Sequence, residues 1–177
     1  LMEREERYSV LKNKNMIIVS LLIYQGLNSF EISALNLDHI NLDKGKIQIK
    51  GSKCVSGRGL RLNFRQMSLF DSYLRIERKN LQRKTTKAFL LGKTGNRITV
   101  EDIHYLISTF KGLFPDRKLT AMSIRKSVIA NWLNEKNIPL EQVQLMAGHK
   151  WISTTFRYKQ INIEQQRKMI NKWFVKL

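Results

Sequence analysis

The chain has 177 residues, 42% hydrophobic and 26% charged, which is the composition of a globular domain and excludes a disordered polypeptide. Its 32 Lys and Arg residues against 14 Asp and Glu residues give a net charge of +18, which favours nucleic acid as partner; a basic ribosome-associated protein or a charged enzyme surface is the alternative. The single cysteine, Cys54, excludes a disulfide framework and a cysteine-rich zinc site, and no apolar run approaches the roughly 18 residues of a membrane span. We therefore expect a reducing, intracellular setting and no membrane partner.

The first half of the chain predicts two helices followed by a β-hairpin. The predicted elements are a helix over 13–26, a short helix at 30–37, a loop at 38–43 and strands over 46–50 and 60–63. Ser29 is a candidate N-cap for the short helix. The turn at 51–59 carries Lys53 and Arg58, so the tip of the hairpin is expected to be positively charged.

The second half is predominantly helical. The predicted elements are helices over 65–83, 99–110, 120–134 and 139–147, with a short buried extended segment at 88–91. The first of these helices is expected to place Met67 and Phe70 inward and Arg75, Arg78 and Lys79 outward. The fold class is therefore mainly α with a small antiparallel β-sheet.

The stretch 145–158 combines residue types that support nucleophilic chemistry. Gly148 suits the left-handed turn that ends many helices, His149 follows it, and Ser153-Thr-Thr could cap a new helix. Tyr158 then brings a hydroxyl that can form covalent intermediates beside a proton-handling histidine. Both side chains could instead be ordinary polar surface residues.

These residues, taken together, resemble the C-terminal catalytic domain of the tyrosine recombinases, or phage-type integrases. The likeness consists of Ala-Gly-His149, Thr-Thr and Tyr158, preceded by Ile-Arg125-Lys-Ser, and it extends to Gly26-Leu27 and Glu31-Ile32 before the hairpin. The resemblance implies the fold of the tyrosine recombinase catalytic domain. It also implies an enzyme that cleaves and rejoins double-stranded DNA through a 3′-phosphotyrosyl intermediate, without metal or cofactor.

The resemblance also assigns roles to individual residues. Tyr158 would be the nucleophile, Arg125 would clamp the phosphate with its planar fork, and His149 would donate to the phosphate or handle the tyrosine proton. Lys53 is the best match for the lysine that protonates the leaving 5′-oxygen, one position later than the usual spacing. Residues expected to contact DNA are Arg58, Arg61, Lys126 and Lys150.

Two positions depart from the family pattern. Asn28 stands where the first arginine is usual, and Met122 stands where a histidine precedes the second arginine. Neither side chain supplies a positive charge. Arg58, Arg61 or Lys126 could therefore reach the phosphate in place of the missing basic residues. The alternative is that the protein is a catalytically degenerate DNA-binding or regulatory relative.

Other features have ordinary structural explanations. His39 and His104 lack a partner pattern, and the Glu101-Asp102 pair suits the first turn of a helix better than a metal site, which weakens a metal-dependent nuclease as a rival.

Residues 1–177 are expected to form a single catalytic domain, part of a longer integrase whose N-terminal DNA core-binding domain is absent from this sequence. The stripe of Ile163, Ile170, Trp173 and Phe174 in segment 161–177 could pack on its own domain or dock on a neighbouring subunit. The resemblance implies a homotetramer on DNA, although the isolated domain could be a monomer. It also implies a location in the bacterial cytoplasm, on the nucleoid when the protein is bound to DNA.

Overall fold

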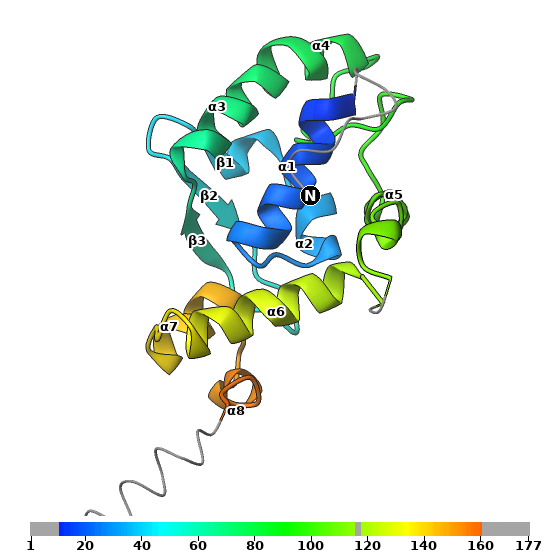
Figure 1. The fold of residues 1–177 in the computed structure, drawn as a ribbon. Coiled ribbons are helices and arrows are strands. Elements are labelled where there is room, and N and C mark those ends of the chain that lie inside the picture. The colour runs from blue at the N-terminus through cyan, green and yellow to red at the C-terminus, as the bar shows by residue number, and fades with distance from the viewer. Residues whose placement is uncertain (1–10, 116–117, 161–177) are drawn as a thin grey trace, which may run out of the picture.

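The computed structural model describes residues 11–115 and 118–160 and has the expected mainly α architecture with one small sheet (Figure 1). The elements of its N-terminal half are α1 (Lys12–Tyr24), α2 (Ser29–Ser33), η2 (Leu37–His39), β1 (Ile40–Asn41), β2 (Lys46–Ile49) and β3 (Arg58–Arg61). The following elements are α3 (Phe64–Ser72), η3 (Tyr73–Glu77), α4 (Arg78–Leu81), α5 (Val100–Ser108), η4 (Lys111–Leu113), α6 (Ala121–Asn134), α7 (Leu140–Ala147) and α8 (Ile152–Phe156).

Helix α1 is the centre of the core rather than a helix with one apolar face. Its residues from Ile17 to Leu22 are all buried, which requires neighbours on every side, and α3, η3 and α6 pack against it. The core continues through Phe70, Tyr73 and Phe89, and the ring of Phe89 contacts the other two. The predicted helix at 13–26 is thus confirmed, and its position explains why its apolar face is so wide.

The sheet has three antiparallel strands in the order β1-β2-β3, one more than the sequence predicted. Residues 40 and 41, predicted as part of a loop, form β1 and pair with β2. The second hairpin strand begins at Arg58 and not at residue 60, and Arg58 lies opposite Ile49. Because side chains alternate along a strand, Arg58 shares the buried face with Leu60, whereas Arg61 is exposed.

The long helix predicted at 65–83 is present as α3, the π-helical η3 and α4 in succession. One of its expected outward residues is buried: Arg78 is only 6% exposed. Its guanidinium crosses to the buried extended segment at 88–91 and donates to the carbonyl oxygens of Ala88 and Phe89. The prediction that Arg78 faces solvent was wrong because helical spacing cannot reveal backbone acceptors on another segment.

The C-terminal half packs α6, α7 and α8 together below the core (Figure 1). Thr120 caps α6, and Ile129, Trp132, Val143 and Ala147 form a second small core between α6 and α7. None of the helices within the described residues is long and apolar enough to cross a membrane. The apolar stripe at 163–174 lies outside the described residues.

Candidate active site

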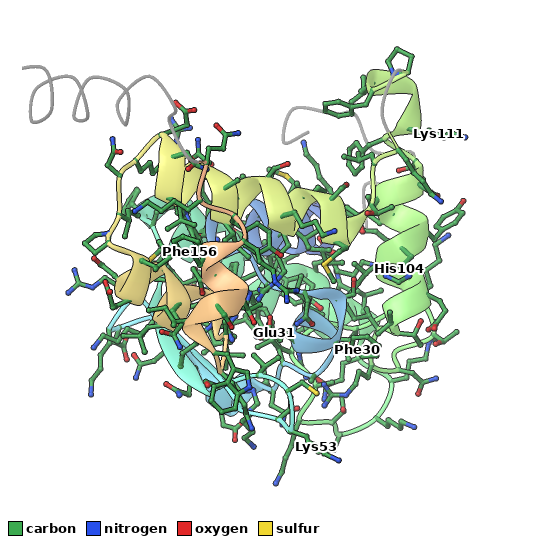
Figure 2. All side chains as sticks on the ribbon, turned by 90° about the horizontal axis from the view of Figure 1, so that it is seen from below. Phe30, Glu31, Lys53, His104, Lys111 and Phe156 are labelled. Atoms are coloured by element: carbon green, nitrogen blue, oxygen red, sulfur yellow. The ribbon has the colours of Figure 1, made fainter. Side chains whose placement is uncertain are left out.

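Helix α2 places a carboxylate at the centre of the candidate site. Asn28, and not the predicted Ser29, caps this helix: its Oδ1 accepts from the Glu31 backbone N–H at 2.9 Å, while Glu31 Oε2 accepts from the Asn28 backbone N–H at 2.9 Å. This reciprocal pair fixes the Glu31 carboxylate, whose side chain is 8% exposed, in the interior (Figure 2). Asn28 therefore has a local structural role at the position where the family pattern has an arginine.

Arg125 projects from α6 into the same interior. Its Nη1 donates to the Gly26 carbonyl oxygen and lies 3.7 Å from Glu31 Oε2, and its Nη2 donates to the Ala147 carbonyl oxygen at 2.6 Å. Burial lowers the pKa of Arg125, an effect that the Glu31 charge opposes and the Arg58 charge adds to. The guanidinium therefore ties α6 to the turn after α1 and to the end of α7.

Arg58 reaches the same carboxylate from strand β3. Its Nη1 lies 2.7 Å from Glu31 Oε1, and its Nε donates to the Met146 carbonyl oxygen at 2.7 Å. Arg58 is 8% exposed, and its Nη2 is buried without a hydrogen-bond partner among the described residues. Glu31 thus holds two buried arginines, which leaves the group with one positive charge in excess.

The turn after α7 lies directly on the Arg58 guanidinium. Gly148 has the left-handed φ of 71°, and hydrogen bonds from Gly148 N–H to Leu145 O and from His149 N–H to Gln144 O close the helix end. A Cβ at Gly148 would meet Arg58 Cζ at 2.9 Å. Glycine is therefore required here both by backbone conformation and by the close approach of the arginine.

His149 is held by a threonine and is neutral at physiological pH. Its Nδ1 lies 2.9 Å from Thr155 Oγ1. Burial, together with the charges of Arg125 and Arg58, lowers the pKa of His149 to about 4. Thr155 belongs to the predicted capping cluster, but α8 begins at Ile152 after Trp151, which makes no side-chain cap; that prediction was wrong because Ser153-Thr-Thr lies inside the helix, with Thr155 against the histidine.

Tyr158 completes the group immediately after α8. Its ring stacks on His149, with centroids 6.0 Å apart and planes at 19°, and it packs partly on the small core between α6 and α7. Asn134 at the end of α6 donates to the Tyr158 carbonyl oxygen and accepts from the Gln160 N–H. The tyrosine charge is also among the influences on the pKa of Arg125, so the nucleophile candidate lies near the buried arginine.

The hairpin loop is joined to the histidine turn. Ser56 N–H donates to Gly148 O at 2.9 Å, and Val55 and His149 form a β-bridge. Lys53, two residues earlier on this loop, is exposed, and Figure 2 shows it projecting at the edge of the molecule while Glu31 lies near the middle. Lys53 is therefore two residues from the segment that pairs with the His149 turn, and its side chain is directed to solvent.

The remaining predicted DNA contacts do not join the buried group. Arg61, Lys126 and Lys150 are exposed, and none of the interactions described above involves their side chains. Met122 is 54% exposed at the start of α6. The structure therefore brings together Arg58, Arg125, His149 and Tyr158, and leaves the other basic residues on the surface.

The sequence-based prediction assigned two residues of the site, Glu31 and Thr155, no part in its chemistry. Glu31 was recognisable as the third residue after Asn28 in a capping box, but its second function, bridging two arginines, depends on segments distant in sequence. Thr155 lies in α8 and His149 lies before it, so the periodicity of a single helix or strand does not relate them. Arg58 lies two residues before Leu60, so the alternation of a strand could have indicated that both side chains are buried on the same face.

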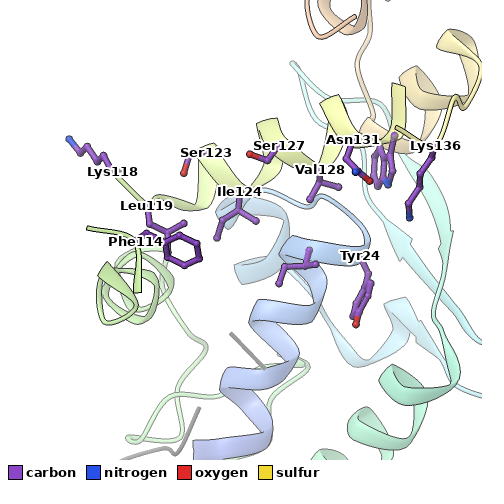
Figure 3. A pocket seen from close by; sticks show the side chains of 12 residues that line it. Tyr24, Phe114, Lys118, Leu119, Ser123, Ile124, Ser127, Val128, Asn131 and Lys136 are labelled. Atoms are coloured by element: carbon purple, nitrogen blue, oxygen red, sulfur yellow. The ribbon is translucent and has the colours of Figure 1, made fainter. Parts of the chain in front are cut away.

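A separate groove is lined by other residues of α6. It has a volume of about 640 Å³ and is lined by residues such as Tyr24, Leu119, Ser127 and Val128, mostly with apolar surface (Figure 3). Arg125 does not line it, so this groove is separate from the arginine group. Within 11–115 and 118–160, no three His, Cys, Asp or Glu side chains gather as a metal site would require.

Comparisons with known proteins agree on one family. The chain is 31% identical over 163 residues to the tyrosine recombinase XerD of Staphylococcus haemolyticus, covering 90% of this chain and 54% of that protein. It is 28% identical to the tyrosine recombinase XerC of Caldanaerobacter subterraneus, covering 91% of this chain and 45% of that protein. The chain thus spans about half the length of these curated relatives.

Solved structures show the same fold. A XerH site-specific recombinase bound to difH substrate in a pre-cleavage complex matches 97% of this chain and 50% of its own, with a TM-score of 0.82 and 21% identity. A lambda integrase dimer bound to a COC′ core site matches 87% of this chain with a TM-score of 0.62 and 13% identity. The model of the family described as the phage integrase family matches residues 1–165. The chain therefore belongs to the phage integrase family of tyrosine recombinases.

Proposed function

We propose that this chain is the catalytic part of a site-specific DNA recombinase or integrase. The Tyr158 oxygen attacks a DNA phosphodiester, forming a 3′-phosphotyrosyl bond and releasing a 5′-hydroxyl; the 5′-hydroxyl of another strand then attacks that bond and frees the tyrosine. One observation carries the proposal: the stacked pair of Tyr158 and His149 stands beside two buried arginines that share a single carboxylate. The family and the recombinase names of the relatives support it.

Arg125 is the proposed clamp for the phosphoryl oxygens. A guanidinium has five N–H donors, and two of those of Arg125 are used on the Gly26 and Ala147 carbonyl oxygens. These bonds, with the Glu31 carboxylate, fix the orientation of the fork before DNA binds. Preorganised donors of this kind stabilise the charge that develops in phosphoryl transfer without reorganising during the reaction.

His149 is the proposed proton acceptor for Tyr158. With a pKa lowered to about 4 the imidazole is neutral, so one ring nitrogen can accept a proton while the other donates. Thr155 fixes the ring through Nδ1, and the phenol proton passes to histidine as the oxygen–phosphorus bond forms. The leaving 5′-oxygen takes its proton from Lys53, whose loop is anchored at the His149 turn.

The experiment is covalent trapping on nicked DNA. A duplex selected by the protein from a random pool is nicked so that the cleaved fragment diffuses away; the wild type should form a complex that survives sodium dodecyl sulfate, and Tyr158→Phe should form none. Salt-sensitive binding that is equal in both proteins, with no trapped complex in either, would contradict the enzymatic function and leave a DNA-binding relative.

The larger assembly is also a proposal. We infer a homotetramer on double-stranded DNA, acting in the bacterial cytoplasm, with residues 161–177 docking on a neighbouring subunit and a further DNA-binding domain elsewhere in the full protein. The DNA-bound XerH and lambda integrase structures support DNA as partner. Light scattering of the protein with its selected duplex, before and after truncation at residue 160, tests this assembly: the truncated chain should lose the tetramer and keep its fold.

A further inference from the structure

One cationic donor in the candidate site has no acceptor. Within the described residues, two buried side-chain nitrogen or oxygen atoms lack a hydrogen-bond partner, His39 Nε2 and Arg58 Nη2. The histidine lies in η2, outside the site, whereas Arg58 lies against the Gly148–His149 turn. A buried guanidinium nitrogen without an acceptor is costly, and such atoms are rare unless a ligand completes them.

The unpartnered nitrogen is held in a fixed position. Arg58 Nε donates to the Met146 carbonyl oxygen, Nη1 is bound to Glu31 at 2.7 Å, and Gly148 lies close against the guanidinium. These contacts leave the planar fork little freedom to rotate. The direction of Nη2 is therefore built into the fold and is not an accident of a flexible side chain.

The charge of the group calls for an anion. Glu31 neutralises one of its two arginines, and His149 is neutral at physiological pH, so one positive charge stays buried without a counterion. A phosphoryl group under attack carries two non-bridging oxygens, and the single fork of Arg125 is already bonded to two carbonyl groups. Asn28 brings no charge, and its side chain caps α2.

We propose that Arg58 is the second phosphate-binding cation of this site, with Nη2 donating to a non-bridging oxygen of the DNA phosphate that Tyr158 attacks. The proposal rests on the proposed function and adds a catalytic residue supplied by the hairpin strand in place of Asn28. Because Nη2 is buried, neighbouring side chains must move for the phosphate to reach it. Arg58 from β3 and Arg125 from α6 then both bind one phosphate.

The test measures coupling between Arg58 and one phosphate charge. In a Tyr158→Phe background, which prevents cleavage, dissociation constants are measured for the selected duplex with a neutral methylphosphonate placed at each linkage in turn. At one linkage per strand, loss of the charge should weaken binding at least 10-fold when Arg58 is present and less than 2-fold in Arg58→Ala. Arg125→Ala should show coupling at the same linkage.

Controls separate this role from a purely structural one. Arg65→Ala, which removes an exposed arginine charge from α3, should leave the methylphosphonate effect at that linkage unchanged. If Arg58→Ala does not fold by circular dichroism, Arg58→Lys keeps the charge without the fork and should retain about 3-fold selectivity. Equal binding losses on phosphate and methylphosphonate, or coupling at a linkage other than that of Arg125, would overturn the proposal.

The measurement also separates this inference from the proposed function. Coupling at the shared linkage without covalent trapping by the wild type would mean that the phosphate site exists and the chemistry does not. Trapping that depends on Tyr158, with no linkage coupled to Arg58, would mean the reverse: a working recombinase whose second cation is another residue.

Discussion

Arg78 and Arg58 are two buried arginines in one molecule, 6% and 8% exposed, with different surroundings. All three guanidinium nitrogens of Arg78 have acceptors, supplied by the carbonyl oxygens of Thr86, Ala88 and Phe89 and by Gln82 Oε1. Arg58 has two of its nitrogens bound and the third unpartnered. Burial of an arginine therefore does not identify a site; Arg58 differs in having an unpartnered donor held beside the Gly148–His149 turn.

The two arginines also differ in the charged groups that surround them. Arg78 binds neutral acceptors, mostly on the segment after its own helix, and burial lowers its pKa. Arg58 shares one carboxylate with a second arginine beside a histidine and a tyrosine. The first arrangement joins the helix to the extended segment that follows it, and the second leaves one buried donor without an acceptor. The predictions that follow test this division.

The largest effect is expected at the arginine clamp. Arg125→Ala should lower the rate of covalent trapping by about 1000-fold, or about 4 kcal/mol, because a preorganised cation is lost at the phosphate. Arg125→Lys should retain part of the rate, since a point charge replaces the fork. Single-turnover trapping with the nicked duplex measures both, and a loss smaller than 10-fold in Arg125→Ala would remove Arg125 from the reaction.

The structural arginine should affect stability alone. Arg78→Ala should lower the free energy of unfolding by about 3 kcal/mol, because several buried carbonyl oxygens lose their donor. Urea denaturation measures this, with Arg75→Ala, an exposed neighbour paired with Asp71, as a control expected to change little. The folded fraction of Arg78→Ala should keep wild-type selectivity for phosphate over methylphosphonate; a lost selectivity would break the comparison with Arg58.

A smaller effect is expected at the turn that covers Arg58. Gly148→Ala should cost about 2 kcal/mol of stability, since alanine must adopt a φ of 71° and its Cβ would meet Arg58 and Val55. Gly112→Ala is the matched control, because a Cβ there meets no atom within 4 Å. Thermal unfolding distinguishes them, and comparable shifts in both variants would argue against a tight contact between Gly148 and Arg58.

The smallest effect is a pH dependence at His149. Its pKa is about 4 in the folded protein and near 6.5 when unfolded, so the unfolded chain gains a proton first as pH falls. This stabilisation is complete above pH 6.5 and is lost between pH 6.5 and 4; it amounts to about 1 kcal/mol after allowance for partial exposure. The difference in unfolding free energy between wild type and His149→Gln should shrink over this range, and a difference independent of pH would contradict the shift.

The sequence predicted the elements that depend on local patterns. Alternation predicted the hairpin, helical spacing predicted the helices that form α5 and α6, and a glycine before a histidine predicted the turn at the end of α7. It failed where an element depends on a partner outside its own segment: β1 needs β2 to be a strand, and the inward position of Arg78 needs carbonyl oxygens of another segment. Asn28, and not Ser29, caps α2, because Asn28 and Glu31 each accept a hydrogen bond from the backbone N–H of the other.

For the site, the sequence alone determined the residue types and their order: Arg125, the Gly148–His149 turn and Tyr158. Only the tertiary structure decided how they are joined, because Glu31 meets Arg58 from 27 residues away and brings it to the same interior as Arg125. Local periodicity specifies which side of a helix or strand a residue occupies. The acceptor that a buried charge finds, and the donor left without one, depend on how distant segments pack.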